Sequence, residues 1–127
     1  MKRSTSILLA GTAMLMSSFA WAQYDPQCED NAQYAQDSQV CYQAREKHFD
    51  GVLNQSYQAL MKQQSSTGKA KLRQMQRAWI RERDTECRAV VGKTAAGAGV
   101  AGDKCLADFT EDRALEMRSW LKQGKRF

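Results

Sequence analysis

Proline and histidine are almost absent from this sequence, which contains one of each, Pro26 and His48. Runs in which β-branched residues alternate with polar ones, the pattern of a half-buried strand, are missing as well. The abundant residues are Gln, Ala, Lys, Arg, Glu, Leu and Met, all of which are favourable in helices. The composition therefore predicts a mainly helical chain that has little material for histidine-based catalysis or metal binding.

The N-terminus has the three parts of a secretory signal peptide. Lys2 and Arg3 supply positive charge, residues 7–16 are almost entirely apolar, and the AWA at 20–22 places small residues where a signal peptidase cleaves. The apolar run is shorter than the stretch of about 20 residues that spans a membrane. We therefore expect cleavage before Gln23 rather than a retained anchor.

Residues 1–22 are thus predicted to be a signal peptide, and residues 23–127 a single domain exported to the periplasm. Loss of Lys2 and Arg3 lowers the formal net charge from +5 to +3. The remaining charges of both signs are interspersed, whereas nucleic-acid-binding proteins carry clustered positive charge. We expect no nucleic-acid partner. We also expect no membrane anchor, since no cysteine that could carry a lipid follows the cleavage site directly.

The predicted domain contains four cysteines, Cys28, Cys41, Cys87 and Cys105. An even number of cysteines in an exported chain predicts two disulfides. Zinc sites usually use closely spaced cysteine pairs, which this chain lacks, so we expect no metal ion and no other cofactor. Pairing of Cys28 with Cys41 and of Cys87 with Cys105 is favoured because each bridge closes a local loop. A bridge between Cys41 and Cys87 stays an alternative.

Three segments, at about residues 38–64, 69–91 and 103–123, have hydrophobic side chains at helical spacings of three and four. Residues 65–68 should end the first helix, Asp103 is a good N-cap for the third, and the tail after it is expected to fray. Helices joined by short connections pack antiparallel, which brings all the cysteines to one end. The predicted fold is all-α: a small antiparallel bundle of about three main helices, stapled by two disulfides. The side chains expected in its core include Phe49, Leu53, Tyr57, Leu60, Leu72, Trp79, Ile80, Leu106, Phe109, Met117 and Trp120.

Two surfaces are candidates for binding a partner. The segment Gly92–Gly102 is rich in glycine and alanine and is predicted to be a loop; the alternative is a plain connector. The second surface is a row of arginines at i, i+4 spacing on the outer face of the second helix; the alternative is an ordinary solvated face. The candidate contact residues are Lys93, Thr94, Gly97, Gly99, Arg77 and Arg81, with Arg73 in the same row.

Motifs for catalysis are missing. The chain has no nucleophile elbow and no phosphate-binding glycine loop. Adjacent carboxylates such as Glu111 and Asp112 point in different directions on a helix, and this pair fits the first turn of the third helix, where negative charge is favourable. We therefore expect no enzymatic activity and assign no catalytic residue.

Arg83 and Arg113 fall on the hydrophobic stripes of the second and third helices. Two interpretations stay open. The guanidinium groups bind carboxylates or carbonyls inside the bundle, or their stems are buried while the charged ends reach solvent.

Three motifs occur in a fixed order: LNQSYQAL at 53–60, LRQMQRAWIRERDTEC at 72–87 and, after Cys105, TEDRALEM at 110–117. With the earlier cysteine pair, this order resembles the lysozyme inhibitor LprI-like domain family over about residues 28–121. The resemblance implies a small exported helical domain with disulfides. It transfers no inhibitory residues, because the shared positions look like core and disulfide positions.

Two functions remain as hypotheses. The first is a periplasmic protein-binding module that inhibits lysozyme or another cell-wall hydrolase, as the family name implies, with the segment Gly92–Gly102 in contact with the target. The alternative is an envelope structural or interaction protein that has no hydrolase target and binds another envelope protein through Arg77 and Arg81. The sequence does not give an oligomeric state.

Overall fold

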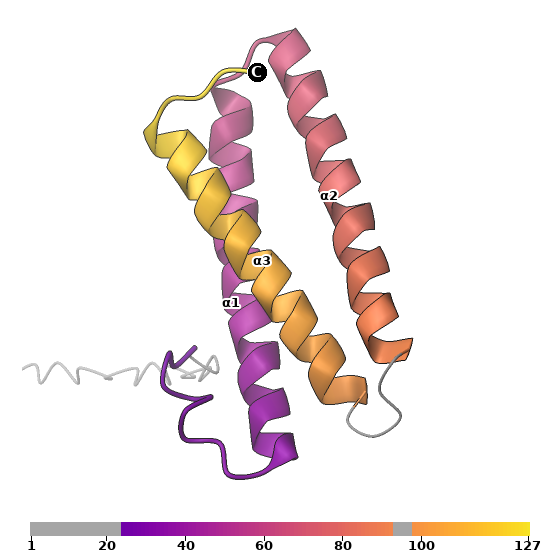
Figure 1. Cartoon of the computed structure of the whole chain (residues 1–127). Helices are drawn as coiled ribbons and strands as arrows, with labels where there is room; N and C mark the ends of the chain where they lie inside the picture. Colours follow the sequence, from indigo (N-terminus) through magenta and orange to yellow (C-terminus); the bar gives the residue numbers. More distant parts are fainter. Residues whose placement is uncertain (1–23, 93–97) are drawn as a thin grey trace, which may run out of the picture.

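The chain forms the long α-helices α1 (Ala35–Lys62), α2 (Ser66–Gly92) and α3 (Ala98–Lys122) (Figure 1). The computed structural model describes residues 24–92 and 98–127, and none of these lies in a β-strand. No helix within these ranges combines the length and the hydropathy that crossing a membrane requires. The predicted all-α fold is confirmed.

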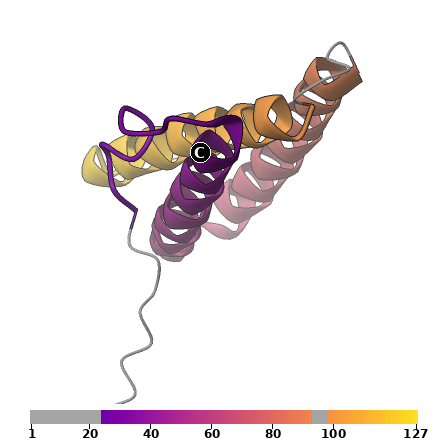
Figure 2. The same cartoon turned by 90° about the horizontal axis from the view of Figure 1, so that it is seen from below.

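The three helices form a bundle in which α3 has the central place. α3 packs along α1 and also against α2, whereas α1 and α2 scarcely contact each other. Viewed from below, α3 lies across both of the other helices (Figure 2). Although α1 and α2 run antiparallel as predicted (Figure 1), α2 is therefore held to the rest of the molecule mainly through α3.

The hydrophobic core follows the predicted stripes closely. Its buried members are Phe49, Leu53, Leu60, Leu72, Ala114 and Met117, and Val52, Tyr57, Met61, Trp79 and Trp120 pack against them. Ile80 was expected among these residues, but it is 39% exposed. The prediction failed at Ile80 because α2 has one main neighbour, and a single packed helix covers only a narrow stripe of α2.

Both disulfides have the local pairing that the sequence favours. Cys28–Cys41 joins the segment before α1 to the first turns of that helix. Cys87–Cys105 joins the end of α2 to α3. The first bridge holds a segment of turns in which the Cys28 amide donates a hydrogen bond to the Asp25 carbonyl at 3.0 Å. The second bridge holds α2 and α3 together close to the connection between them.

The third helix begins earlier than predicted, because α3 starts at Ala98. The predicted loop Gly92–Gly102 therefore overlaps the start of α3, and Asp103 lies inside the helix rather than at its N-cap. Gly102 is buried inside this helix, and a Cβ atom there would lie 2.8 Å from Val91 Cγ2. The glycine therefore allows α2 and α3 to approach closely. Asp103 accepts hydrogen bonds from the side chains of Gln39 and Gln43, both at 2.9 Å, and so links α3 to α1.

The tail after α3, expected to fray, is docked against the turn between α1 and α2 (Figure 1). Gly124 has a positive φ of 62°, and the amides of Gly124 and Lys125 donate to the carbonyls of Leu121 and Trp120. These two bonds form a Schellman motif, which turns the chain back at the helix end. The buried Gln64 side chain then donates to the Lys125 carbonyl at 2.9 Å and accepts from the Phe127 amide at 3.1 Å.

Candidate functional site

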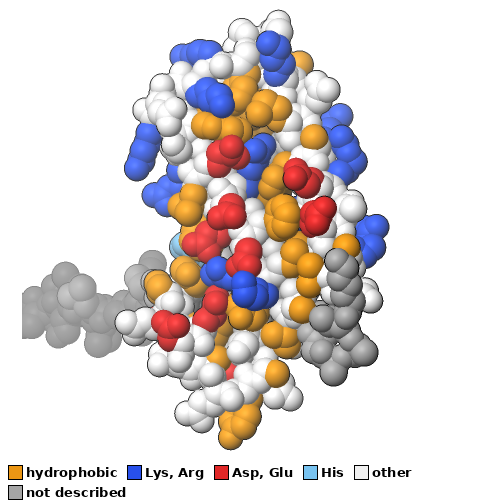
Figure 3. Space-filling view, in the orientation of Figure 1, with side chains coloured by type: hydrophobic (Ala, Val, Ile, Leu, Met, Phe, Trp, Pro, Cys, Tyr) orange, Lys and Arg blue, Asp and Glu red, His pale blue; other side chains and the backbone are white. Residues whose placement is uncertain are grey.

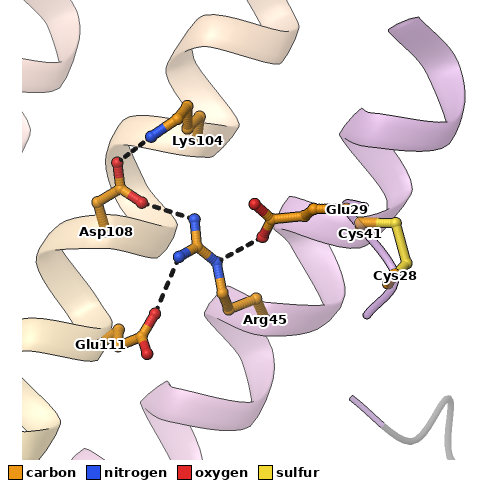
Figure 4. Close-up of polar contacts among 7 residues, drawn as sticks. All are labelled: Cys28, Glu29, Cys41, Arg45, Lys104, Asp108 and Glu111. Atoms are coloured by element: carbon orange, nitrogen blue, oxygen red, sulfur yellow. Dashed lines mark hydrogen bonds and ion pairs between the residues drawn. A yellow bond between two sulfur atoms is a disulfide. The ribbon is translucent and has the colours of Figure 1, made fainter. Parts of the chain in front are cut away.

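A network of charged side chains centred on Arg45 connects the N-terminal segment, α1 and α3 (Figure 4). Arg45 Nη2 lies 2.6 Å from Asp108 Oδ1, and Nη1 lies 2.9 Å from Glu111 Oε2. Arg45 Nε lies 2.9 Å from Glu29 Oε1 but makes no hydrogen bond, so this contact is an ion pair. One guanidinium group thus connects three carboxylates from two separate parts of the chain.

The network is largely removed from solvent at its centre. The Arg45 side chain is 12% exposed, and the three carboxylate side chains are 27–41% exposed. Burial lowers the pKa of Arg45, but its hydrogen bonds and the nearby carboxylates outweigh burial and raise that pKa. Asp108 also accepts a hydrogen bond from Lys104 at 2.6 Å, which raises the pKa of Lys104. Arg45 therefore orients Asp108, which also pairs with the exposed Lys104 ammonium group.

We refer to the region around the Cys87–Cys105 bridge, at the ends of α2 and α3, as the disulfide pole. Two hollows lie there, of about 320 and 260 Å³. Each has a mainly apolar lining and a pair of oppositely charged side chains. The first is lined by Val90, Ala101, Lys104, Cys105, Asp108 and Phe109, and the second by Asp84, Cys87, Arg88, Val91, Gly102 and Leu106.

One of the predicted loop contacts, Gly99, falls at this same pole. Gly99 lies in the first turn of α3 and is exposed. A Cβ atom at Gly99 would lie 3.2 Å from the Gln39 side chain, so this turn also approaches α1. Lys93, Thr94 and Gly97 lie outside the residues that the structure describes.

The other predicted surface, the arginine row, consists of Arg73, Arg77 and Arg81 on α2. With Ala70 and Gln74 these arginines line a shallow hollow of about 420 Å³, to which no other helix contributes. All three are exposed. Figure 3 shows Lys and Arg side chains along the edge of the molecule over α2, whereas Asp and Glu side chains gather down the middle of the same face.

The two arginines on the hydrophobic stripes have protein partners. Arg83 donates to Asp84 at 2.8 and 2.9 Å, and its guanidinium carbon lies 5.1 Å from the centre of the Trp79 ring. Arg113 is 8% exposed and donates to Gln76 at 3.1 Å and to Glu116 at 2.6 Å. Arg113 also lies against the rings of Trp79 and Trp120, at 5.7 and 5.0 Å. Both guanidinium groups therefore bind carboxylates, but Asp84 and Glu116 are 44% and 46% exposed, so the two ion pairs lie at the edge of the bundle rather than inside it.

Glu46 on α1 is half-buried, and its carboxylate forms no hydrogen bond with a described residue. Burial raises its pKa, Asp50 raises it further, and Arg83 partly lowers it. Glu111 and Asp112, expected in the first turn of the third helix, lie in the middle of α3 instead. Within residues 24–92 and 98–127 no group of three or more His, Cys, Asp or Glu side chains could hold a metal ion.

The sequence did not single out Arg45, although a usable pattern was present. Arg45 lies four residues after Cys41 and four before Phe49, so it falls on the buried face of α1. Arg83 and Arg113 were recognised by the same pattern. The partners of Arg45, Asp108 and Glu111, are 63 and 66 residues away in the chain, so the pairing itself could not be predicted from local spacing.

Comparison with families supports the resemblance noted in the sequence. The chain matches the family model described as Lysozyme inhibitor LprI over residues 28–117. Comparisons with curated proteins and with solved structures gave no match. The matched range contains both disulfides, the Arg45 network and the disulfide pole. Because it covers well over half of the chain, this protein belongs to the family described as Lysozyme inhibitor LprI.

Proposed function

We propose that this protein is exported to the periplasm, where it binds a cell-wall hydrolase of the lysozyme class and inhibits it through the disulfide pole. The observation that carries the proposal is the pair of mainly apolar hollows beside the Cys87–Cys105 bridge. Family membership supports binding of a protein target. Cleavage before Gln23 is part of the same proposal.

The composition of the pole supports a protein partner. Protein interfaces combine an apolar centre with a polar rim, and here Val91, Leu106 and Phe109 line hollows that charged pairs border. Lys104 and Asp108, which form an ion pair, border the first hollow, and Asp84 and Arg88 border the second. Such a surface buries hydrophobic area on binding while its rim stays hydrated.

The pole is also fixed before it meets a target. The Cys87–Cys105 bridge holds the two helices, and the Arg45 network holds Asp108 and Lys104 at the edge of the first hollow. A surface that is already ordered loses little conformational entropy on binding. This rigidity favours tight binding by a small interface.

We propose that the connection between α2 and α3 enters the active site of such enzymes. Glycoside hydrolases carry a pair of carboxylates that face each other across a cleft. Residues 93–97 have the sequence KTAAG, with small side chains and a single charge on Lys93. Small side chains with a single positive charge suit an acidic cleft, so Lys93, Thr94, Gly97 and Gly99 remain the proposed contacts.

A lysis assay with purified, exported protein tests this function. Val91→Glu places a charge beside an apolar hollow, and Leu115→Glu is a matched control, since these side chains are 39% and 48% exposed and Leu115 lines neither hollow. We expect the wild type and the control to inhibit at least one lysozyme type. Val91→Glu should be weaker by about tenfold or more, as for a central interface position.

Two results would reject the proposal. Excess wild-type protein that leaves every tested hydrolase fully active would exclude inhibition of those enzymes, and would favour the alternative of an envelope interaction protein. Equal inhibition by Val91→Glu and Leu115→Glu would place the contact away from the disulfide pole.

A further inference from the structure

The arginine row of α2 lines neither hollow of the disulfide pole, and the proposed inhibition does not use it. Arg73, Arg77 and Arg81 follow one another at i, i+4 spacing, so their stems project from one side of the helix about 6 Å apart along its axis. All three side chains are exposed. The row is therefore a compact line of positive charge along the outer side of α2.

No described carboxylate neutralises this row. None of the three arginines forms a hydrogen bond or ion pair with residues 24–92 or 98–127. Asp84, three residues after Arg81, binds Arg83 instead. By contrast, Arg45, Arg83 and Arg113 all pair with carboxylates. The positive charge of the row is thus available to a partner.

From these observations we propose that the arginine row binds the surface of an anionic phospholipid membrane. Apart from the arginines, the hollow is lined by Ala70 and Gln74, so it offers no aromatic side chain of the kind that anchors many protein–protein interfaces. The hollow is shallow and residues of a single helix line it, so the row can lie against a flat surface. Clustered basic residues on a helix are attracted to anionic lipid head groups.

One apolar side chain borders the row and fits the same partner. Ile80 follows Arg77 by three residues and is 39% exposed. In helices that lie at a membrane interface, aliphatic side chains next to basic ones enter the head-group region. A single isoleucine adds little to the attachment, so binding should be mainly electrostatic, reversible and sensitive to salt.

The expected strength follows from the number of arginines. Each basic residue near an anionic bilayer increases partitioning by about fivefold, so the three together contribute on the order of 100-fold at low ionic strength. Loss of two arginines should reduce partitioning by about 25-fold. Because the screening length falls to about 3 Å at 1 M salt, concentrated salt should release the protein.

Co-sedimentation with vesicles tests the proposal with purified, exported protein. One set of vesicles contains phosphatidylglycerol and phosphatidylcholine, and the other phosphatidylcholine alone. Arg77→Gln with Arg81→Gln removes two charges from the row. Arg118→Gln with Lys122→Gln is the matched control, because it removes two charges from exposed positions on α3. Circular dichroism checks that both double variants keep their helices.

We expect the wild type and the α3 variant to bind the anionic vesicles, with at least a 20-fold loss for the α2 variant and no binding to phosphatidylcholine alone. Equal losses in the two variants would show that net charge, rather than the arginine row, attracts the protein, and would overturn the proposal. Absence of binding to anionic vesicles would do so too, as would capture of an acidic protein by the same row without lipid binding. Because Val91 is unchanged in every variant, the outcome is independent of hydrolase inhibition.

Discussion

Replacement of Arg45 by methionine tests whether the charged network holds α1, α3 and the N-terminal segment together. Methionine keeps the length of the buried stem but removes the guanidinium group. Glu29, Asp108 and Glu111 would then lie near one another without the cation that now binds all three. The substitution should therefore lower the free energy of unfolding through lost attraction and through repulsion between carboxylates.

The expected loss of unfolding free energy depends on how deeply Arg45 and its carboxylate partners are buried. Removal of one member of a fully buried ion pair costs about 3–5 kcal/mol, whereas exposed pairs contribute about 0–1 kcal/mol. The Arg45 side chain is 12% exposed, but its carboxylate partners are 27–41% exposed, so water can partly rehydrate them. We expect a loss of about 2 kcal/mol, which is large for a domain whose total stability is about 5–15 kcal/mol.

Urea unfolding followed by circular dichroism measures this loss. With a slope of about 1–1.5 kcal/mol per M for a chain of this size, the midpoint should fall by about 1.5 M. Lys104→Met is the control, because it breaks the Lys104–Asp108 pair, in which the side chains are 52% and 41% exposed. This variant should stay within about 0.5 kcal/mol of the wild type. If Arg45→Met is no more destabilising than Lys104→Met, the central role given to Arg45 is wrong.

Two further predictions concern stability. Gly68→Ala should destabilise the protein by about 1 kcal/mol in urea melts, since a Cβ there would lie 3.1 Å from the Phe127 carbonyl oxygen. At Gly51 a Cβ would meet no atom within 4 Å, so Gly51→Ala should stabilise α1 by about 1 kcal/mol. A stabilising Gly68→Ala would show that the tail is not docked there. Burial and Asp50 raise the pKa of Glu46 above its ordinary 4.5. The folded chain therefore holds the proton of Glu46 more tightly than the unfolded chain, and the free energy of unfolding falls as pH rises from the ordinary pKa through the raised one. Glu46→Gln should therefore stabilise the protein at neutral pH, with a gain that disappears towards about pH 4; a gain that is independent of pH would contradict this explanation.

The helices and most of the core were predictable because they depend on local spacing. Phe49, Leu53 and Leu60 recur at helical intervals, and this pattern alone places them on one buried face. The disulfide pairing followed in the same way from the preference for local loops. Such features need no knowledge of which helices touch.

The features that were missed depend on contacts between distant residues. Gly99 and Gly102 suggested a loop, but they lie in α3, where Gly102 allows close contact with Val91. The tail was expected to fray, yet Gln64 binds Lys125 and Phe127 across more than 60 residues of chain. In both cases tertiary packing overrides a local preference.

The same limit applies to the candidate site. The exposed arginine row could be predicted from periodicity, because exposure on a helix follows from the position of the opposite, buried face. The apolar hollows of the disulfide pole could not, because each is lined by residues of both α2 and α3. Both hollows depend on how closely α2 and α3 approach each other, and local spacing does not determine that distance.

Titration of a hydrolase of the lysozyme class with the purified protein in a calorimeter tests whether the disulfide pole binds such an enzyme. We expect saturable one-to-one binding by the wild type, the same affinity for Leu115→Glu, and an affinity lower by about tenfold or more for Val91→Glu. Equal affinities for all three proteins, or no heat of binding with any enzyme that the wild type inhibits, would contradict this expectation.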